Sequence, residues 1–214
     1  MMYGDDSARD DGLASLSLLA KFPHEQTRKM LGEVFQDYEE SIYLIPEAER
    51  RKKVGPYLWS AVAKMGFLSG RVYVTSPSME GLAAWLTPGK TELSIWQMIH
   101  FGVIFNLFRA GAKTYARLFA LVQHEEKLHR LCAPFPHWYL LLLGVRPEHQ
   151  GLGYASRLLK PMLNWLDHEQ IPCFLFTYRE SNVSLYEHFG FKVIKKSNIP
   201  KTDCHIWAML REHI

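Results

Sequence analysis

The chain has 214 residues, a formal net charge of +3 and 48% hydrophobic residues, a composition typical of a folded globular protein. This length suffices to bury a hydrophobic core, and we expect a single domain spanning residues 1–214. The weak net charge gives no sign of nucleic-acid binding, and no apolar stretch reaches the ~20 residues that a bilayer span needs. We therefore expect neither a nucleic-acid nor a membrane partner, and nothing in the pattern indicates an oligomeric state.

The N-terminal segment and the cysteines bear on where the protein works. Residues 1–12 are polar and acidic, so we expect a mobile tail rather than a targeting segment. The three cysteines, Cys132, Cys173 and Cys204, lie far apart in the chain. A sparse, odd set argues against a disulfide framework and favours a reducing, cytoplasmic location.

The first third of the chain predicts two helices followed by a β-hairpin. Apolar residues recur at helical spacing over His24–Tyr38 and again over Tyr57–Leu68. Arg71–Thr75 and Gly81–Leu86 are short and rich in β-formers, with Ser-Pro-Ser between them, which predicts two paired strands. The charged run Glu49–Lys53 predicts a solvated helix end rather than a binding patch.

A helical insertion is expected over residues 93–131. Leu93–Phe108 is strongly apolar and predicts a buried or lid-forming helix, and Ala112–Leu131 predicts a second helix. In this second helix, His124 and His129 resemble a zinc-binding pair. Five residues separate them, so they would point about 140° apart around the helix. We expect a solvated face there and no metal site.

The rest of the chain predicts a mixed α/β (α+β) domain in which helices pack on a sheet. The expected strands and helices are, in chain order, strand Trp138–Val145, helix Gly151–His168, strand Cys173–Tyr178, helix Asn182–Phe189, and strands Phe191–Lys195 and Cys204–Arg211. Pro161 lies inside the first of these helices and removes a backbone donor, so we expect a kink there.

The stretch VRPEHQGLGYA places two glycines between the first strand and the helix, a pattern typical of phosphate binding. A Walker loop requires Lys followed by Ser or Thr, but Tyr154 and Ala155 follow the glycines here. A dinucleotide fingerprint accommodates Gly151 and Gly153. However, five residues separate the strand from the first glycine, and Ser156 occupies the third glycine position. A nicotinamide-dependent enzyme is therefore the less favoured alternative.

The same stretch, V-x-P-x-x-Q-x-x-G-x-A, resembles the acetyl-CoA signature of the GCN5-related N-acetyltransferase (GNAT) superfamily. Downstream, NVSLYEHFGF resembles the second signature of this family, and the two blocks span Trp138–Phe191. The resemblance implies a mixed, mostly antiparallel sheet with helices on both faces and a helical insertion before the coenzyme strand. The in-helix proline and the sequence WLTP at Trp85–Pro88 resemble puromycin N-acetyltransferase-like members.

The resemblance also implies acetyl-CoA as the cofactor, with coenzyme A as product and no metal. Backbone N–H groups at the helix N-terminus would hold the pyrophosphate, and the edge of the coenzyme strand would pair with the pantetheine arm. The residues expected to contact the coenzyme are Leu143, Val145, Gln150, Gly151, Leu152, Gly153, Tyr154, Ala155 and Asn182. Asn182 could equally cap the helix that it opens.

Tyr186 is the expected general acid in the transfer of an acetyl group to the primary amine of a small molecule. Its unperturbed pKa of ~10 keeps it protonated at neutral pH, so it can protonate a departing thiolate of pKa ~8.5. The alternative is that Tyr186 is only a core aromatic residue.

No general base is evident in the sequence. The coenzyme strand, WYLLLLGV, carries no carboxylate or histidine, and Phe176 stands where relatives often carry glutamate. Either a water wire leads to His137, Glu92 or Glu180, or the acceptor is an amine of low pKa, such as an α-amino group at ~8. A chain that binds acetyl-CoA without a base would be a non-catalytic sensor, which is the other alternative.

Overall fold

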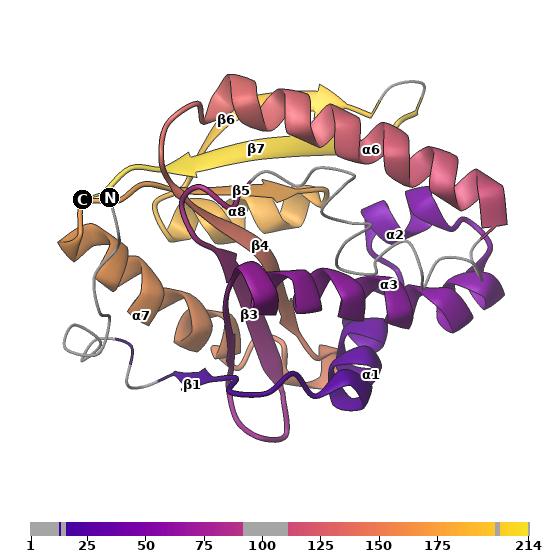
Figure 1. Ribbon diagram of the computed structural model, residues 1–214, viewed down its shortest axis with the longest axis horizontal. Coiled ribbons are helices and arrows are strands. Elements are labelled where there is room, and N and C mark those ends of the chain that lie inside the picture. The colour runs from indigo at the N-terminus through magenta and orange to yellow at the C-terminus, as the bar shows by residue number, and fades with distance from the viewer. Residues whose placement is uncertain (1–12, 14–15, 92–110, 200–201, 214) are drawn as a thin grey trace.

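The computed structural model describes residues 13, 16–91, 111–199 and 202–213. In this part of the chain a seven-stranded sheet has the order β1-β2-β3-β4-β5-β7-β6 (Figure 1). Neighbouring strands are antiparallel except for the parallel pair β4–β5. The strands are β1 (Ser17–Leu18), β2 (Gly70–Val74), β3 (Gly81–Leu86), β4 (Trp138–Val145), β5 (Cys173–Thr177), β6 (Lys192–Asn198) and β7 (His205–Arg211).

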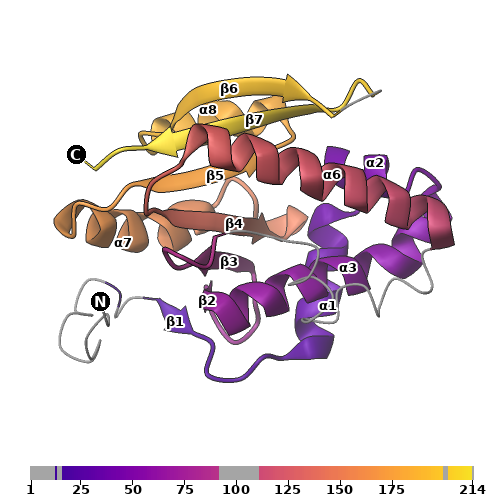
Figure 2. The same cartoon turned by 45° about the horizontal axis from the view of Figure 1, so that its top comes forward.

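Helices cover both faces of the sheet (Figures 1 and 2). They are α1 (His24–Phe35), α2 (Glu39–Leu44), α3 (Ala48–Ser69), α6 (Gly111–Cys132), α7 (Tyr154–His168) and α8 (Glu180–His188). Helices α1, α2, α3 and α6 share buried clusters with one face, and α7 and α8 pack on the other. The expected fold class, a mostly antiparallel α/β sheet with helices on both faces, is confirmed.

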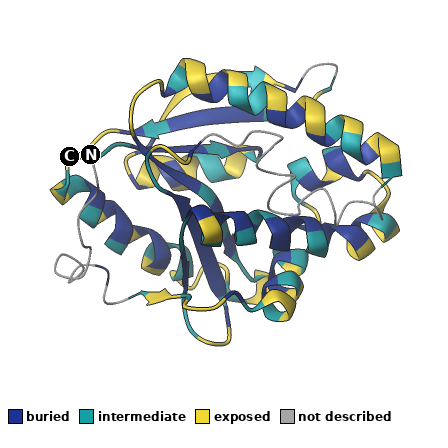
Figure 3. Ribbon diagram, in the orientation of Figure 1, coloured by how far each residue is buried: buried dark blue, intermediate teal, exposed yellow. Residues whose placement is uncertain are grey.

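Alternation along the strands explains this two-sided core. In β2, Val72 and Val74 pack with α1 and α3, whereas Tyr73 between them packs with α7. Successive side chains of a strand point to opposite faces, so a strand with apolar residues at every position requires cover on both sides. Figure 3 shows the result, in which the central strands are buried and the outer surfaces of the helices are exposed.

Strands β4 and β5 separate halfway along β4. Their pairing ends at Leu140 with Leu175, whereas β4 stays paired with β3 as far as Val145. At the same place the register between β3 and β4 shifts, so that Leu141 is an extra residue in β4. A bulge of this kind bends its strand. Beyond it, one edge of β4 has no partner among the described strands.

Several helix boundaries differ from the prediction, including the starts of α7 at Tyr154 and of α8 at Glu180. Helix α1 ends at Phe35, earlier than expected, and α3 begins at Ala48, well before the expected start at Tyr57. The prediction treated the preceding Pro56 as a boundary, but it lies inside α3 and fits closely against α1. A Cβ added at Gly32 would lie 2.7 Å from the Pro56 side chain. Tertiary packing thus offsets the local cost of a proline. The short elements α2 and β1 were not predicted.

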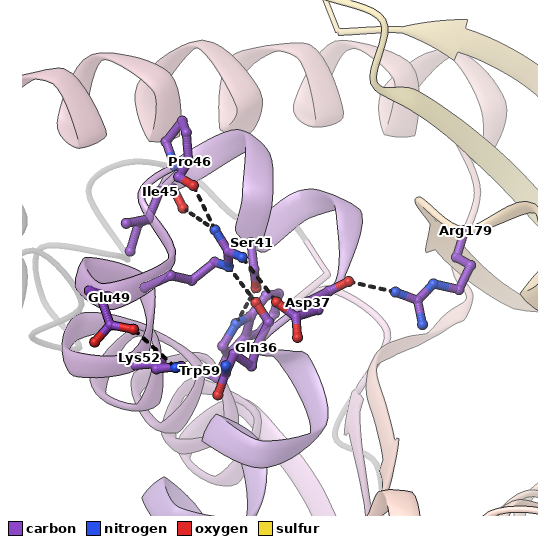
Figure 4. Close-up of polar contacts among 10 residues, drawn as sticks. Gln36, Asp37, Ser41, Ile45, Pro46, Glu49, Lys52, Trp59 and Arg179 are labelled. Carbon is purple, nitrogen blue, oxygen red and sulfur yellow. Dashed lines mark hydrogen bonds and ion pairs between the residues drawn. The ribbon is translucent and has the colours of Figure 1, made fainter.

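The sequence predicted that the charged run at the start of α3 is solvated, but one of its residues is buried. Arg51 is only 6% exposed. Its guanidinium group donates hydrogen bonds to three backbone carbonyls between α1 and α3 and pairs with Asp37 (Figure 4). The carbonyls are those of Gln36 at 2.5 Å and of Ile45 and Pro46 at 2.9 Å each. Carbonyls that follow a helix lack intrahelical donors, and Arg51 supplies them.

Several other expectations can be placed on the structure. Helix α7 runs without interruption through Pro161, and α6 confirms the second helix of the insertion. The expected tail and the apolar segment Leu93–Phe108 lie outside the described residues. All three cysteines are free thiols. In the described part of the chain, no helix is both long enough and apolar enough to span a bilayer.

Candidate active site

A groove of about 390 Å³ opens where β4 and β5 separate. It is lined by every residue that the sequence assigned to the coenzyme except Leu152, whose side chain is 66% exposed. These residues are Leu143, Val145, Gln150, Gly151, Gly153, Tyr154, Ala155 and Asn182, and Tyr186 joins them. The groove therefore brings together β4, the loop that follows it, the start of α7 and one face of α8.

The glycine turn before α7 is shaped to receive an anion. Gly151 and Gly153 have φ angles of +75° and +79°, in the left-handed region that favours glycine. A Cβ at either position would meet no atom within 4 Å, so the space above the turn is open. Gly153 is the N-cap of α7, and no side chain caps this helix. Its first N–H groups and the positive end of its dipole are thus available to a phosphate.

The free edge of β4 lies along the same groove. Gln150 fastens the turn to the end of this strand, because its Nε2 donates a hydrogen bond to the carbonyl of Val145 at 3.1 Å. An extended ligand can pair with an exposed strand edge through backbone hydrogen bonds. A strand edge that leads to an anion-binding turn fits a coenzyme with an extended arm and a pyrophosphate.

Asn182 does not cap its helix, so that alternative is wrong. Helix α8 begins at Glu180 with Arg179 as its N-cap, and the N–H of Asn182 donates to the carbonyl of Arg179 at 3.0 Å. Asn182 lies in the first turn and lines the groove. Its contact with the coenzyme stays a prediction.

Tyr186 lies where the groove meets a second cavity, and it lines both. It is 6% exposed and packs in the core, with its ring 5.9 Å from that of Phe191. Burial, with smaller contributions from Tyr38 and Cys173, raises the pKa of Tyr186 above its usual value. The hydroxyl therefore keeps its proton at neutral pH. Tyr186 is a core aromatic residue, and it also faces the space where a reaction would occur.

The second cavity, of about 90 Å³, is enclosed by α2, α3, α6, β4 and β5. Its walls are mainly apolar and aromatic, with side chains that include Leu44, Leu58, Trp59, Val62, Met65, Leu118, Leu121, Val122, Tyr139, Phe176 and Tyr178. Two carboxylates, Glu40 and Glu125, also line it. We call this space the carboxylate cavity.

Glu125 is the functional candidate that the sequence analysis missed. It is half-buried and lies on α6 in line with the buried residues Leu118, Leu121, Val122 and Leu128. The hydroxyl of Tyr178 donates a hydrogen bond to it at 2.5 Å. Burial raises the pKa of Glu125 to about 7 even though this hydrogen bond favours the ionised form. A carboxylate at helical spacing within an apolar stripe was the available signal.

Two of the three bases suggested by the sequence, His137 and Glu180, lie away from the groove and the carboxylate cavity. Glu92 is outside the described residues, and Glu180 is exposed at the start of α8. His137 is buried in a separate hollow beside His129, with 2.7 Å between their Nε2 atoms. His129 is only 6% exposed, so the expectation of a solvated face was wrong at this position. Burial, with smaller contributions from His137 and Arg130, lowers the pKa of His129 to about 4.

A family profile and a curated relative indicate the same family. A profile of the Acetyltransferase (GNAT) family matches residues 110–191, which include β4, the glycine turn and α8. An uncharacterized N-acetyltransferase of Schizosaccharomyces pombe is 30% identical over 115 residues, 52% of this chain and 47% of that protein. Residues 110–191 of this chain are thus similar to the GNAT acetyltransferase family. It aligns with less than half the length of the fission-yeast relative.

Solved structures share the GNAT fold. A Corynebacterium glutamicum protein described as histone acetyltransferase HPA2 and related acetyltransferase superimposes with a TM-score of 0.61 at 20% identity, over 94% of this chain and 97% of its own. Arylalkylamine N-acetyltransferase 2 of Aedes aegypti also gives 0.61, at 10% identity, over 92% and 97%. At these identities the likeness establishes the fold. The narrower resemblance to puromycin N-acetyltransferase-like members stays a prediction.

Proposed function

We propose that this chain is an acetyl-CoA-dependent N-acetyltransferase that acts on the primary amine of a small molecule. The observation that carries the proposal is the junction at Tyr186, where a groove with a glycine turn meets a second cavity, which apolar and aromatic side chains and two carboxylates line. The match of residues 110–191 to the GNAT family supports acetyl-CoA as the donor. The names of the fission-yeast and mosquito relatives support an amine acceptor. A single domain over residues 1–214 and a cytoplasmic location are part of this proposal.

Each part of the groove has a role in this reaction. When bound, acetyl-CoA supplies an acetyl group activated as a thioester. The N–H groups from Gly151 to Ala155 bind the pyrophosphate, and the edge of β4 at Leu143 and Val145 orients the extended arm. Tyr186 holds the proton that the leaving sulfur requires. No metal is needed, because the amine itself is the nucleophile once it has lost its proton.

Ligand binding tests the proposal against its alternatives. Saturating acetyl-CoA, at about 100 times Kd, should raise the Tm by roughly 5–10 °C in a thermal unfolding assay, whereas NADH should leave it unchanged. A panel containing 2-phenylethylamine, agmatine, spermidine, puromycin and a peptide with a free N-terminus should include an amine that releases free CoA. Stabilisation by NADH alone would identify a nicotinamide enzyme. Binding of acetyl-CoA with no CoA release from any amine would identify a sensor.

Replacing Gly153 with Ala should weaken acetyl-CoA binding by about tenfold or more, the equivalent of at least ~1.4 kcal/mol. The methyl group would project into the open space above the turn, and the φ of +79° would strain the backbone. Gly89→Ala is a matched control, because Gly89 has a φ of +81°, equally open surroundings and no place in the groove. Calorimetric titration should show weaker binding only for Gly153→Ala. Equal affinities in the two variants would contradict the assignment of the turn.

A further inference from the structure

The carboxylate cavity contains two acidic side chains in surroundings that are otherwise unfavourable to charge. Among the described residues that line it, none is a lysine, an arginine or a histidine. Burial and then the charge of Glu125 raise the pKa of Glu40 well above its usual value. Two carboxylates in one apolar cavity therefore favour sharing a proton until a cation enters.

The fold directs Glu40 into this cavity. Its neighbour Glu39 pairs with Arg179 at 2.9 Å, on the side of α2 that faces α8. The next residue, Ser41, is held toward α3 by a hydrogen bond from Trp59 Nε1 to its Oγ at 2.8 Å. Helix α2 also packs against α6, which carries Glu125. Glu40 and Glu125 thus reach one space from two adjacent helices.

We propose that Glu40 and Glu125 bind the ammonium group of the acceptor, and that Glu125 removes its proton before acetyl transfer. The acceptor would be a primary amine carried on a compact apolar or aromatic body. This inference rests on the proposed function and names the substrate class and the base of the same site. The faces of Trp59, Tyr139 and Tyr178 suit such a body, because aromatic rings attract cations and pack well against apolar groups.

The proton balance is complete with groups that the site contains. The ammonium gives one proton to the Glu125 carboxylate, and the neutral nitrogen then attacks the thioester carbonyl carbon. A C–N bond forms, the C–S bond breaks, and the sulfur takes the proton of Tyr186. The second proton lost by the nitrogen restores Tyr186. The products are an amide, a thiol and a protonated Glu125, which loses its proton to solvent.

The groups around the pair reinforce its preference for a cation. The titratable residues that face it or adjoin it are Tyr38, Glu39 and Tyr43 on the α1–α2 side, Tyr139 and Tyr186 from β4 and α8, and Tyr178 and Cys204. None of these carries a positive charge. On α6, Arg117 is directed to the carbonyl of Leu44 at 3.5 Å, and His124 contacts Ser197 at 3.1 Å. Neither of these two side chains lines the cavity.

The first test is the pH dependence of kcat/KM, which reports ionisations of the free enzyme. A base acts only when it is ionised, so kcat/KM should rise with pH through about 7, the pKa of Glu125. The inflection should be the same for amines of pKa ~10 and ~8. Glu125→Gln should lower kcat/KM by about 100-fold or more and abolish the inflection. An inflection that follows the pKa of each amine, or an unaltered profile in Glu125→Gln, would overturn the proposal.

The second test measures recognition without turnover. In the presence of CoA, 2-phenylethylamine should bind and release protons, measured by calorimetry in two buffers of different ionisation enthalpy. Its neutral analogue 2-phenylethanol should bind at least tenfold more weakly. Glu40→Gln and Glu125→Gln should each lose most of this preference and the proton release. Glu126→Gln is the matched control on α6, where Glu126 pairs with Arg130 at 2.6 Å outside the cavity.

The two tests separate the inference from the proposed function. Carboxylate-dependent amine binding without CoA release would support this site and contradict the transferase proposal. Acetyl transfer at an unchanged rate in Glu40→Gln and Glu125→Gln would support the transferase proposal and contradict this site. Thermal unfolding checks that the variants fold. The pH dependence of the stability that it measures is a further test. Because the Glu125 pKa is raised on folding, wild-type stability should fall as the pH rises from about 4.5 to 7, and Glu125→Gln should flatten this slope.

Discussion

Tyr186→Phe is expected to lower kcat by about 10²–10⁴-fold while the KM for acetyl-CoA stays within about twofold. The substitution removes one hydroxyl at the junction of the groove and the carboxylate cavity and keeps the ring that packs against Phe191. Core packing is therefore preserved, and so is the part of the groove wall that the Tyr186 ring forms. Steady-state kinetics with the best amine of the panel, together with acetyl-CoA titration, separates loss of the proton donor from loss of binding.

Tyr38 is the residue that could contradict this assignment, since it also lines both spaces. Its hydroxyl oxygen accepts the N–H of Tyr178 at 3.0 Å and lies 3.1 Å from Thr177 Oγ1. The Tyr38 hydroxyl is thus engaged by both Thr177 and Tyr178, whereas no described residue forms a hydrogen bond with the Tyr186 hydroxyl. A large kcat loss in Tyr38→Phe with little change in Tyr186→Phe would transfer the acid role to Tyr38.

The anion-binding turn could be predicted because its information is local. Two glycines with positive φ, the strand before them and the helix after them lie within one short stretch, and each residue type has a backbone reason for its position. The turn needs no distant partner to take its shape. The sequence therefore indicated both the glycine turn and the order of elements around it.

The carboxylate cavity could not be predicted in the same way, because segments far apart in the sequence line it. Glu40 belongs to a helix that is too short for a periodic signal. Glu125 lies in the sequence between two histidines that resemble a metal-binding pair. The apolar spacing of α6 placed Glu125 on the inner face. Only the packing of α6 on α2 and β7 shows that this face lines a cavity rather than continuous core.

Arg51→Met is expected to destabilise the fold by about 3–5 kcal/mol, which for a chain of this size lowers the Tm by roughly 10 °C. The ion pair with Asp37 accounts for little of this, because that carboxylate is 73% exposed. The larger cost arises from the carbonyls of Gln36, Ile45 and Pro46, which lose their donors in a buried place. Thermal and urea unfolding of the purified variants would measure it.

Two further variants make the Arg51 prediction specific. Lys52→Met should change stability by less than about 0.5 kcal/mol, because its pair with Glu49 is exposed. Arg51→Lys keeps the charge but loses the planar fork of donors, so it should recover only part of the stability. Full recovery by lysine would show that charge, rather than the satisfaction of carbonyls, is what this position requires.

Arg51→Met should also weaken amine binding, because Arg51 holds the segment that carries Glu40. The carbonyl of Asp37 in this segment accepts a hydrogen bond from Arg179 at 2.7 Å, which joins the segment to the start of α8 (Figure 4). Loosening it displaces one side of the carboxylate cavity while the glycine turn keeps its own supports. The KM for the amine should therefore rise several-fold more than the KM for acetyl-CoA. Equal changes in both would mean that Arg51 stabilises the whole fold without any bias toward the acceptor side.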